Sequence, residues 1–263
     1  MKTYTIRPVV LCYSKAEKGF MTYLAGYGEK ITRPYLFWVV EGTGTRILVD
    51  TGIEAKDYLF YDPSFSKLEF HHVCKFEEGL KRLGMRPGDV KLVIQTHLHF
   101  DHCFNLRKCV NAEVLVQEDE VLFAREPHPI FSKMYSLELL KHVRFITLKG
   151  REEVLPGIEV VPVPGHSPGC QAVRVNTEAG RAVISGFCCI RENFFPPSEV
   201  GSATPLLGAG EVIPPGIHWD LAQAYDSMLT VKKMGEIILP QHDPELMNIV
   251  CVPEESRGGF TGD

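Results

Sequence analysis

One run of the sequence combines residue types and spacing suited to binding metal ions, Thr96-His97-Leu98-His99-Phe100-Asp101-His102. Imidazole and carboxylate groups are preferred ligands of zinc and similar divalent ions, and a catalytic site leaves one position open for water. Side chains two apart in an extended segment point the same way, so His97 and His99 can bind one ion together. Asp101 and His102 follow where the chain turns, and we expect them to face a second ion. Isolated histidines usually only form hydrogen bonds, but this spacing favours a metal site.

Two further histidines come directly after predicted strands. His166 lies in the segment Pro164-Gly165-His166-Ser167-Pro168-Gly169, and His242 lies in Pro240-Gln241-His242-Asp243. Each alone is as compatible with an ordinary loop residue as with a ligand, but together they supply a third ligand for each ion. Paired ions can share a hydroxide and polarise the carbonyl that it attacks. The sequence therefore predicts a metal-dependent hydrolase site.

Predicted strands place all three segments. Val90 to Gln95 leads into the histidine run, Ile158 to Val163 ends before His166, and Glu236 to Leu239 ends before His242. Further strands are predicted over residues 9–12, 34–40, 47–49, 114–117, 171–176 and 181–185, and helices over residues 76–83, 118–125, 136–142 and 221–235. Asp220 is the expected N-cap of the last helix.

The composition is that of an ordinary globular protein, with 263 residues, 44% hydrophobic and 23% charged. We expect one domain over residues 1–263, with loop or helical insertions near 56–85, 118–145 and 193–218. The net charge of -5 without a Lys/Arg cluster disfavours a nucleic-acid partner. The absence of a signal-like or membrane-spanning apolar run predicts a cytoplasmic protein with no membrane partner. Its eight cysteines are then expected to remain thiols.

Several motifs together resemble the metallo-β-lactamase superfamily, and the resemblance spans nearly the whole chain. The motifs are Asp50-Thr51-Gly52, the run from His97 to His102, Pro164 to Gly169, Ser185-Gly186, and Leu239-Pro240-Gln241-His242-Asp243. The resemblance implies an α/β fold, an αββα sandwich of two mixed β-sheets flanked by helices, with the metals at one edge. It assigns His97, His99 and His166 to the first metal. It assigns Asp101, His102 and His242 to the second, and it places Asp50 where it orients a ligand histidine.

Within the superfamily, two phrases and the late helix look like the N-acyl homoserine lactonase branch. The phrases are Met85-Arg86-Pro87-Gly88-Asp89-Val90 and Val116-Gln117-Glu118-Asp119-Glu120. That likeness implies a metal-activated hydroxide that opens a small lactone or a related cyclic ester or amide, with Asp101 assisting proton delivery to the leaving alkoxide. Two alternatives are a glyoxalase-like thioester hydrolase, which uses the same six ligands, and a non-catalytic metal-binding or sensing protein.

The sequence departs from the family pattern after Ser185-Gly186. The family usually places there an aspartate that bridges both metals, whereas this chain continues with Phe187-Cys188-Cys189-Ile190. The lactonases also place a tyrosine three residues beyond that aspartate, where Ile190 stands here. Cys188, or failing that Cys189, is predicted to replace the carboxylate as a ligand of the second metal; the alternative is that both thiols are packing residues. We expect two Zn²⁺ ions per chain, with Mn²⁺ or Fe²⁺ as alternatives.

A small-molecule substrate is expected, and aromatic residues of the predicted loops can line its pocket, although packing is their commoner role. The candidates are Tyr58, Phe60, Tyr61, Phe194, Phe195 and Trp219, together with His218. The same exposed aromatic loops and the family resemblance are compatible with a homodimer.

Overall fold

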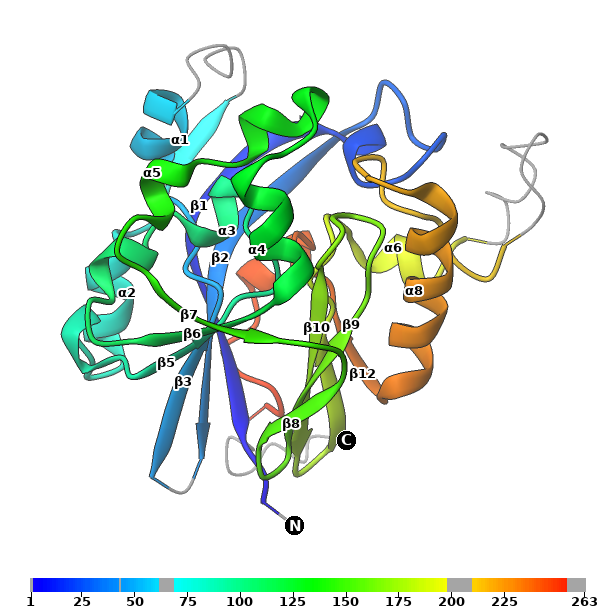
Figure 1. Ribbon diagram of the computed structural model, residues 1–263. Helices are drawn as coiled ribbons and strands as arrows, with labels where there is room; N and C mark the ends of the chain where they lie inside the picture. The colour runs from blue at the N-terminus through cyan, green and yellow to red at the C-terminus, as the bar shows by residue number, and fades with distance from the viewer. Residues whose placement is uncertain (1, 43, 62–68, 198–209, 255–263) are drawn as a thin grey trace.

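The computed structural model describes residues 2–42, 44–61, 69–197 and 210–254, and it shows two β-sheets with helices on their outer sides (Figure 1). In these residues the first sheet has seven strands in the order β4 (Phe70–His72), β1 (Thr5–Glu17), β2 (Lys30–Gly42), β3 (Thr45–Val49), β5 (Leu92–Ile94), β6 (Glu113–Gln117) and β7 (Arg144–Leu148). Strands β4, β1, β2 and β3 pair antiparallel, whereas β3, β5, β6 and β7 pair parallel. This sheet is therefore mixed.

The second sheet is also mixed. Within the described residues its strand order is β12 (Ile237–Leu239), β11 (Gly180–Ile184), β10 (Gln171–Thr177), β9 (Ile158–Pro162) and β8 (Glu152–Leu155). Only the pair β11 and β12 is parallel. Two mixed sheets with flanking helices confirm the predicted αββα sandwich.

The helices are short except for the last. The α-helices are α1 (Ala55–Tyr61), α2 (Phe76–Arg82), α3 (Phe100–Cys103), α4 (Glu118–Arg125), α5 (Leu137–Leu140), α6 (Arg191–Phe194) and α8 (Leu221–Met234). Single 3₁₀ turns are η1 (Lys18–Phe20), η3 (Pro87–Asp89), η4 (Leu106–Lys108), η5 (Pro129–Met134) and η6 (Pro244–Met247). The Asp220 side chain accepts a hydrogen bond from the Gln223 backbone N–H at 2.9 Å, which confirms it as the N-cap of α8.

Strand β2 shows how the sequence builds the layers. Successive strand residues face opposite sides, so Phe37 and Val39 pack in the core beneath α2 and α4. Leu36, Trp38 and Val40 pack instead in the core between the two sheets. All five side chains are almost completely buried, which explains why this strand is a continuous hydrophobic run rather than an alternating one.

The second sheet uses the same alternation. Val173 and Val175 of β10 face the first sheet, whereas Ala172 faces the outer side. There it packs with Met228 and Val231 of α8, which runs along the outside of this sheet (Figure 1). The stripe of apolar residues that predicts a helix in the sequence is therefore the face of α8 that covers the sheet.

Most sequence-predicted elements are present, with differences in extent. Strand β1 begins earlier and ends later than the predicted strand over residues 9–12, because its pairing with β2 continues to Glu17. Strands β4, β7 and β8 and the short helices α1, α3 and α6 were not predicted. The predicted insertions near 56–85 and 193–218 lie partly outside the described residues.

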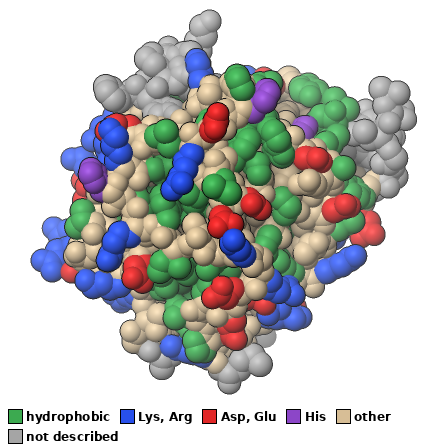
Figure 2. Space-filling view, viewed as in Figure 1, with side chains coloured by type: hydrophobic (Ala, Val, Ile, Leu, Met, Phe, Trp, Pro, Cys, Tyr) green, Lys and Arg blue, Asp and Glu red, His purple; other side chains and the backbone are tan. Residues whose placement is uncertain are grey.

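Charged side chains of both signs are mixed on the face of the molecule seen in Figure 2, and neither sign forms a large patch there. None of the helices in the described ranges has the length and apolarity needed to cross a bilayer.

One close approach between layers gives a test of the fold. A Cβ atom added at Gly169 would lie 2.1 Å from the backbone nitrogen of Glu120 in α4, so the loop that follows His166 depends on glycine here. We expect Gly169→Ala to lower the free energy of unfolding by about 1–3 kcal/mol in urea titrations, since either α4 or the loop must shift. Gly88→Ala is the matched control, because its Cβ would meet nothing closer than 3.7 Å. Equal stability of both variants would contradict this packing.

Candidate metal centre

The three segments that carry the predicted ligands meet at one edge of the sandwich. Strands β3 and β5 run parallel and so end at the same edge, where β3 leads into Asp50 and β5 into the histidine run. In the second sheet, β9 leads into the loop that carries His166, and β12 leads into His242. Parallel strands that end side by side bring loops distant in the sequence together, which is why such edges commonly hold binding sites.

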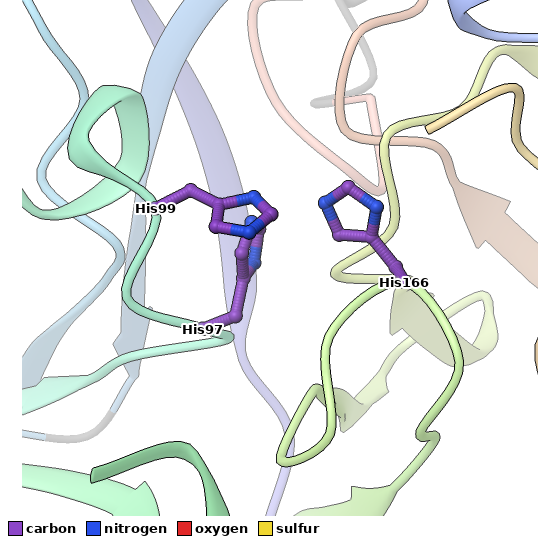
Figure 3. Close-up of side chains that lie close together, drawn as sticks. All are labelled: His97, His99 and His166. Carbon is purple, nitrogen blue, oxygen red and sulfur yellow. The ribbon is translucent and has the colours of Figure 1, made fainter. Parts of the chain in front are cut away.

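The first group consists of His97, His99 and His166, whose nearest ligand atoms all lie within 4.8 Å of one another. Figure 3 shows the His97 and His99 rings on one loop and the His166 ring on the facing loop, turned toward a common space. Ring centres are 4.5 Å apart for His97 and His99, and 4.7 Å apart for His99 and His166. All three residues are buried.

The second group consists of Asp101, His102 and His242, again with ligand atoms within 4.8 Å of one another. The chain enters α3 at Phe100, so the backbone turns between His99 and Asp101. His97 and His99 before the turn therefore face a different position from Asp101 and His102 after it. The centres of the His97 and His102 rings are only 4.0 Å apart, so the two groups adjoin. The structure thus brings together the same two sets of three residues that the sequence analysis predicts.

Hydrogen bonds fix which ring nitrogens face the common space. Nδ1 of His166 lies 2.7 Å from the Ile217 carbonyl oxygen, and Nδ1 of His242 lies 2.9 Å from the Pro34 carbonyl oxygen. A carbonyl oxygen only accepts, so both Nδ1 atoms carry the proton and both Nε2 atoms keep a lone pair. Such outer hydrogen bonds are typical of metal-binding histidines.

Burial also sets the charge of the rings. It lowers the pKa of His166 to about 4 and that of His242 to about 3, and with neighbouring imidazoles it lowers the pKa of His97 and His99 well below the usual value. His102 differs: burial lowers its pKa, but the Asp101 and Asp50 carboxylates raise it more, to a net value above normal. Four of the five imidazoles are therefore neutral, as metal binding requires.

Asp50 joins four segments of the site through one fully buried carboxylate. It accepts hydrogen bonds from the Thr96 backbone N–H at 2.7 Å, from His102 Nδ1 at 2.9 Å and from Gln95 and Gln241 Nε2 at 3.0 and 3.1 Å. The prediction that Asp50 orients a ligand histidine is consistent with this geometry. The residue has a φ of 57°, in the left-handed region that aspartate tolerates better than most residues.

Glu120 of α4 performs the same role between the two loops of the first group. Its fully buried carboxylate accepts from the Leu98 backbone N–H at 2.8 Å, from Ser167 Oγ at 2.7 Å and from the Gly169 backbone N–H at 3.1 Å. One side chain therefore ties the His97 loop to the His166 loop. In the sequence Glu120 is only one residue of a family-like phrase, and nothing local distinguishes it from Glu118.

A cavity of about 320 Å³ opens onto both groups. Among the described residues, its wall includes His99, Asp101, His102, His166 and His242, together with Phe20, Arg33, Tyr58, Phe100, Ile130, Lys133, Met134, Cys188 and Ile217. Within that wall Asp101 is the sole carboxylate. Burial raises the pKa of Asp101, but His102, the other histidines of the site and Arg33 lower it by more, to a net value below normal, so the group is ionised.

The structure places the two candidate cysteines differently. Cys188 belongs to the cavity wall, where its Sγ lies 3.6 Å from Met21 Sδ, and burial raises its thiol pKa. Cys189 points into the core and its Sγ lies 3.2 Å from Ser185 Oγ. The described ligand group of Asp101, His102 and His242 includes neither sulfur. Ligation by Cys188 stays a prediction. All eight cysteines are free and buried, as expected of thiols.

Of the aromatic residues considered for a pocket, Tyr58 lines the cavity. Phe194 is fully buried in the core beneath α8, and Phe195 is 44% exposed. Trp219 packs against Phe123 and Phe131 outside the cavity wall. The side chains of Phe60 and Tyr61 lie outside the described part, and Nδ1 of His218 donates to the Pro215 carbonyl oxygen at 2.9 Å. Arg33, which the sequence gave no reason to select, also lines the cavity.

Comparison with known proteins gives one family match and several relatives. A family model described as the metallo-beta-lactamase superfamily matches residues 32–242. An N-acyl homoserine lactonase from Bacillus thuringiensis is 29% identical over 165 residues, which is 60% of this chain and 64% of that protein. N-acyl homoserine lactonase AiiB from Agrobacterium fabrum is 27% identical over 185 residues, or 63% of this chain and 67% of the relative. The match thus spans less than two thirds of the length of the first of these relatives.

Solved structures show the same fold over nearly the whole chain. A variant of B. thuringiensis AiiA with N-decanoyl-L-homoserine bound at the active site superposes with a TM-score of 0.74 at 23% identity, covering 94% of this chain and 96% of that one. AidC, described as a dizinc quorum-quenching lactonase, gives 0.62 at 14% identity, covering 93% and 89%.

The Asp50 network predicts a selective effect on the second group. In Asp50→Asn the new amide N–H₂ faces groups that already donate, so His102 and Gln241 lose an acceptor. We expect zinc affinity at the second group, Asp101, His102 and His242, to fall about 10- to 100-fold, measured by competition with a chromophoric chelator. Asp226→Asn, on the exposed face of α8, is the control and should bind like the parent protein. Unchanged affinity in Asp50→Asn would remove Asp50 from the metal centre.

Proposed function

The chain belongs to the metallo-β-lactamase superfamily, and on that premise we propose that it is a metal-dependent hydrolase that opens a small lactone or a related cyclic ester or amide. The single observation that carries the proposal is that two adjoining groups of ligand-type side chains form part of the wall of one small cavity. The relatives that match include N-acyl homoserine lactonases, which favours ester-bond opening over other reactions of the superfamily.

The residues fit a pair of metal ions. Nε2 of His97 is a buried nitrogen without a hydrogen-bond partner among the described residues, at the centre of the first group. Five imidazoles and one carboxylate form a donor set that suits zinc better than magnesium or calcium. We therefore assign His97, His99 and His166 to the first ion and Asp101, His102 and His242 to the second. Ions bound there would polarise a substrate carbonyl and make a water more acidic.

The chain's own groups can carry the remaining steps. The apolar part of the wall, with Phe20, Phe100 and Ile217, excludes bulk water from the substrate. The ionised Asp101 carboxylate lies 3.8 Å from His102 Nε2 and faces the cavity, so it can accept the proton of the attacking water. It then returns that proton to the leaving alkoxide when the ring opens.

The test is a substrate panel with measured metal content. We expect the protein loaded with two zinc ions to hydrolyse lactones faster than thioesters or phosphodiesters, and Asp101→Asn to lower kcat by about 100- to 10,000-fold. Metal content of the variant is measured in parallel, because Asp101 is also assigned as a ligand. Asp226→Asn serves again as the control. Turnover of thioesters but not lactones would favour the glyoxalase-like reaction, and no turnover at full metal occupancy would contradict a hydrolase.

Cys188 has a separate test. If its thiolate is a ligand of the second ion, Cys188→Ala reduces the zinc content toward one ion per chain, and a thiolate-to-cobalt charge-transfer band of the Co²⁺-loaded protein disappears. Cys189→Ala is the matched control at the neighbouring position. Two retained ions and an unchanged spectrum in Cys188→Ala would assign Cys188 to packing against Met21.

A further inference from the structure

Arg33 is a buried cation in the wall of the cavity. It lies on β2 and is 5% exposed, and it shares the cavity wall with Asp101 and His242. An arginine side chain stays protonated in proteins, so its charge is retained although almost no water reaches it. Burying a charge without a partner of opposite sign is costly, which makes the surroundings of Arg33 informative.

Its hydrogen bonds do not neutralise it. Nη2 donates to the phenol oxygens of Tyr35 and, at 3.4 Å, of Tyr58, and the guanidinium also interacts with the Cys188 thiol; all three partners are neutral because burial raises their pKa. The ion pairs found among the described residues include none with Arg33, and its Nε has no hydrogen-bond partner there. The charge of Arg33 is therefore not neutralised by the described residues, and because the side chain forms part of the cavity wall, an anion that enters the cavity can pair with it.

Aromatic packing holds the guanidinium in place. Its central carbon lies 4.9 Å from the centre of the Tyr35 ring, a cation–π arrangement. The Tyr35 hydroxyl is itself 3.3 Å from Ser14 Oγ, and the Tyr58 ring contacts those of Phe70 and Phe100 at 4.6 and 5.0 Å between centres. A fixed side chain binds a ligand with less loss of conformational entropy than a mobile one.

We propose that Arg33 binds a carboxylate carried by the substrate, so that the substrates are anionic lactones or related cyclic esters rather than neutral ones. The planar guanidinium matches a carboxylate in shape as well as charge. The cavity wall supports an anion, because its described residues include two cations, Arg33 and Lys133, and the single carboxylate of Asp101. The hydrolysis of such substrates rests on the proposed function, whereas the binding of the anion does not.

The first experiment compares two lactones that differ only in the anionic group, γ-butyrolactone and its γ-carboxylate. We expect the zinc-loaded protein to prefer the carboxylate in kcat/KM, and Arg33→Met to lower that value about 10- to 100-fold, mainly through KM. The neutral lactone should change by less than about twofold under the same loss of one charged contact. Both rings release a new carboxylate on opening, so the ratio of kcat/KM for the two lactones reports the effect of the added carboxylate alone. A parallel loss for both lactones would overturn the proposal.

The second experiment measures binding without turnover and separates this inference from the proposed function. Cyclopentanone and a cyclopentanone carboxylate are titrated calorimetrically into the parent protein, Arg33→Met and Arg33→Lys. We expect the carboxylate to bind the parent more tightly, Arg33→Met to abolish the difference, and Arg33→Lys to keep part of it. This result with no lactone turnover would sustain the anion site and contradict the lactonase. A difference that survives in Arg33→Met would overturn the anion site even if lactones are hydrolysed.

Two controls guard against indirect effects. Arg86→Met removes an arginine whose side chain is 84% exposed. It should leave unchanged both the preference in kcat/KM for the anionic lactone and the preference in affinity for the cyclopentanone carboxylate. Lys133→Met tests the other cation of the wall, and loss of the anion preference in this variant alone would overturn the assignment to Arg33. Should Arg33→Met fail to fold, as judged by circular dichroism, Arg33→Lys decides: an anion preference equal to that of the parent in both experiments contradicts the proposal.

Discussion

The site depends first on the buried carboxylate of Asp50. A fully buried anion must be satisfied by several donors, and Asp50, at the end of β3, takes them from the ends of β5 and β12 and from His102. The strand β12 belongs to the second sheet, so this one group joins the two halves of the sandwich at the edge where the ligand histidines gather. Because each donor is itself held by Asp50, the position of any one of them constrains the others. The ligands can therefore come from segments far apart in the sequence and still meet.

Glu120 extends the same principle to the first group of histidines. It lies on α4, outside the sheets, yet it holds the backbone of both loops that carry His97 and His166. Burial raises its pKa, and the donors from Leu98, Ser167 and Gly169 oppose that effect. Each half of the metal centre is thus supported by one buried carboxylate that does not itself belong to a ligand group. Buried networks of this kind fix one arrangement of side chains when every member is satisfied.

The sequence predicted the parts of this centre that obey local rules, and it missed those that arise only from the fold. Histidines at strand ends, the spacing of His97 and His99, and the alternation of the core strands are all visible within a few residues of one another. The role of Glu120 is not, because its donors in the two ligand loops, Leu98, Ser167 and Gly169, lie 22, 47 and 49 residues away. Nor is that of Arg33, whose neighbours in the sequence, Thr32 and Pro34, give no sign that its guanidinium is buried beside a cavity. Short unpredicted strands such as β8 are likewise fixed by pairing with a neighbour rather than by their own composition.

Two features of this chain act in the same direction on the charge of the cavity, the missing aspartate after Gly186 and the buried cation of Arg33. The position after Gly186, where the family usually has a bridging aspartate, is occupied by Phe187, which is fully buried in the core beneath α8. The wall also holds the cation of Arg33, placed close enough to His242 and His102 to lower the pKa of both. The second ligand group therefore has one carboxylate, that of Asp101, and a buried positive charge shares its cavity wall. With two divalent ions bound, the excess of positive charge would be larger still, and a carboxylate on the substrate would compensate part of it. The absence of a carboxylate after Gly186 and the proposed anionic substrate therefore fit the same balance of charge in the site.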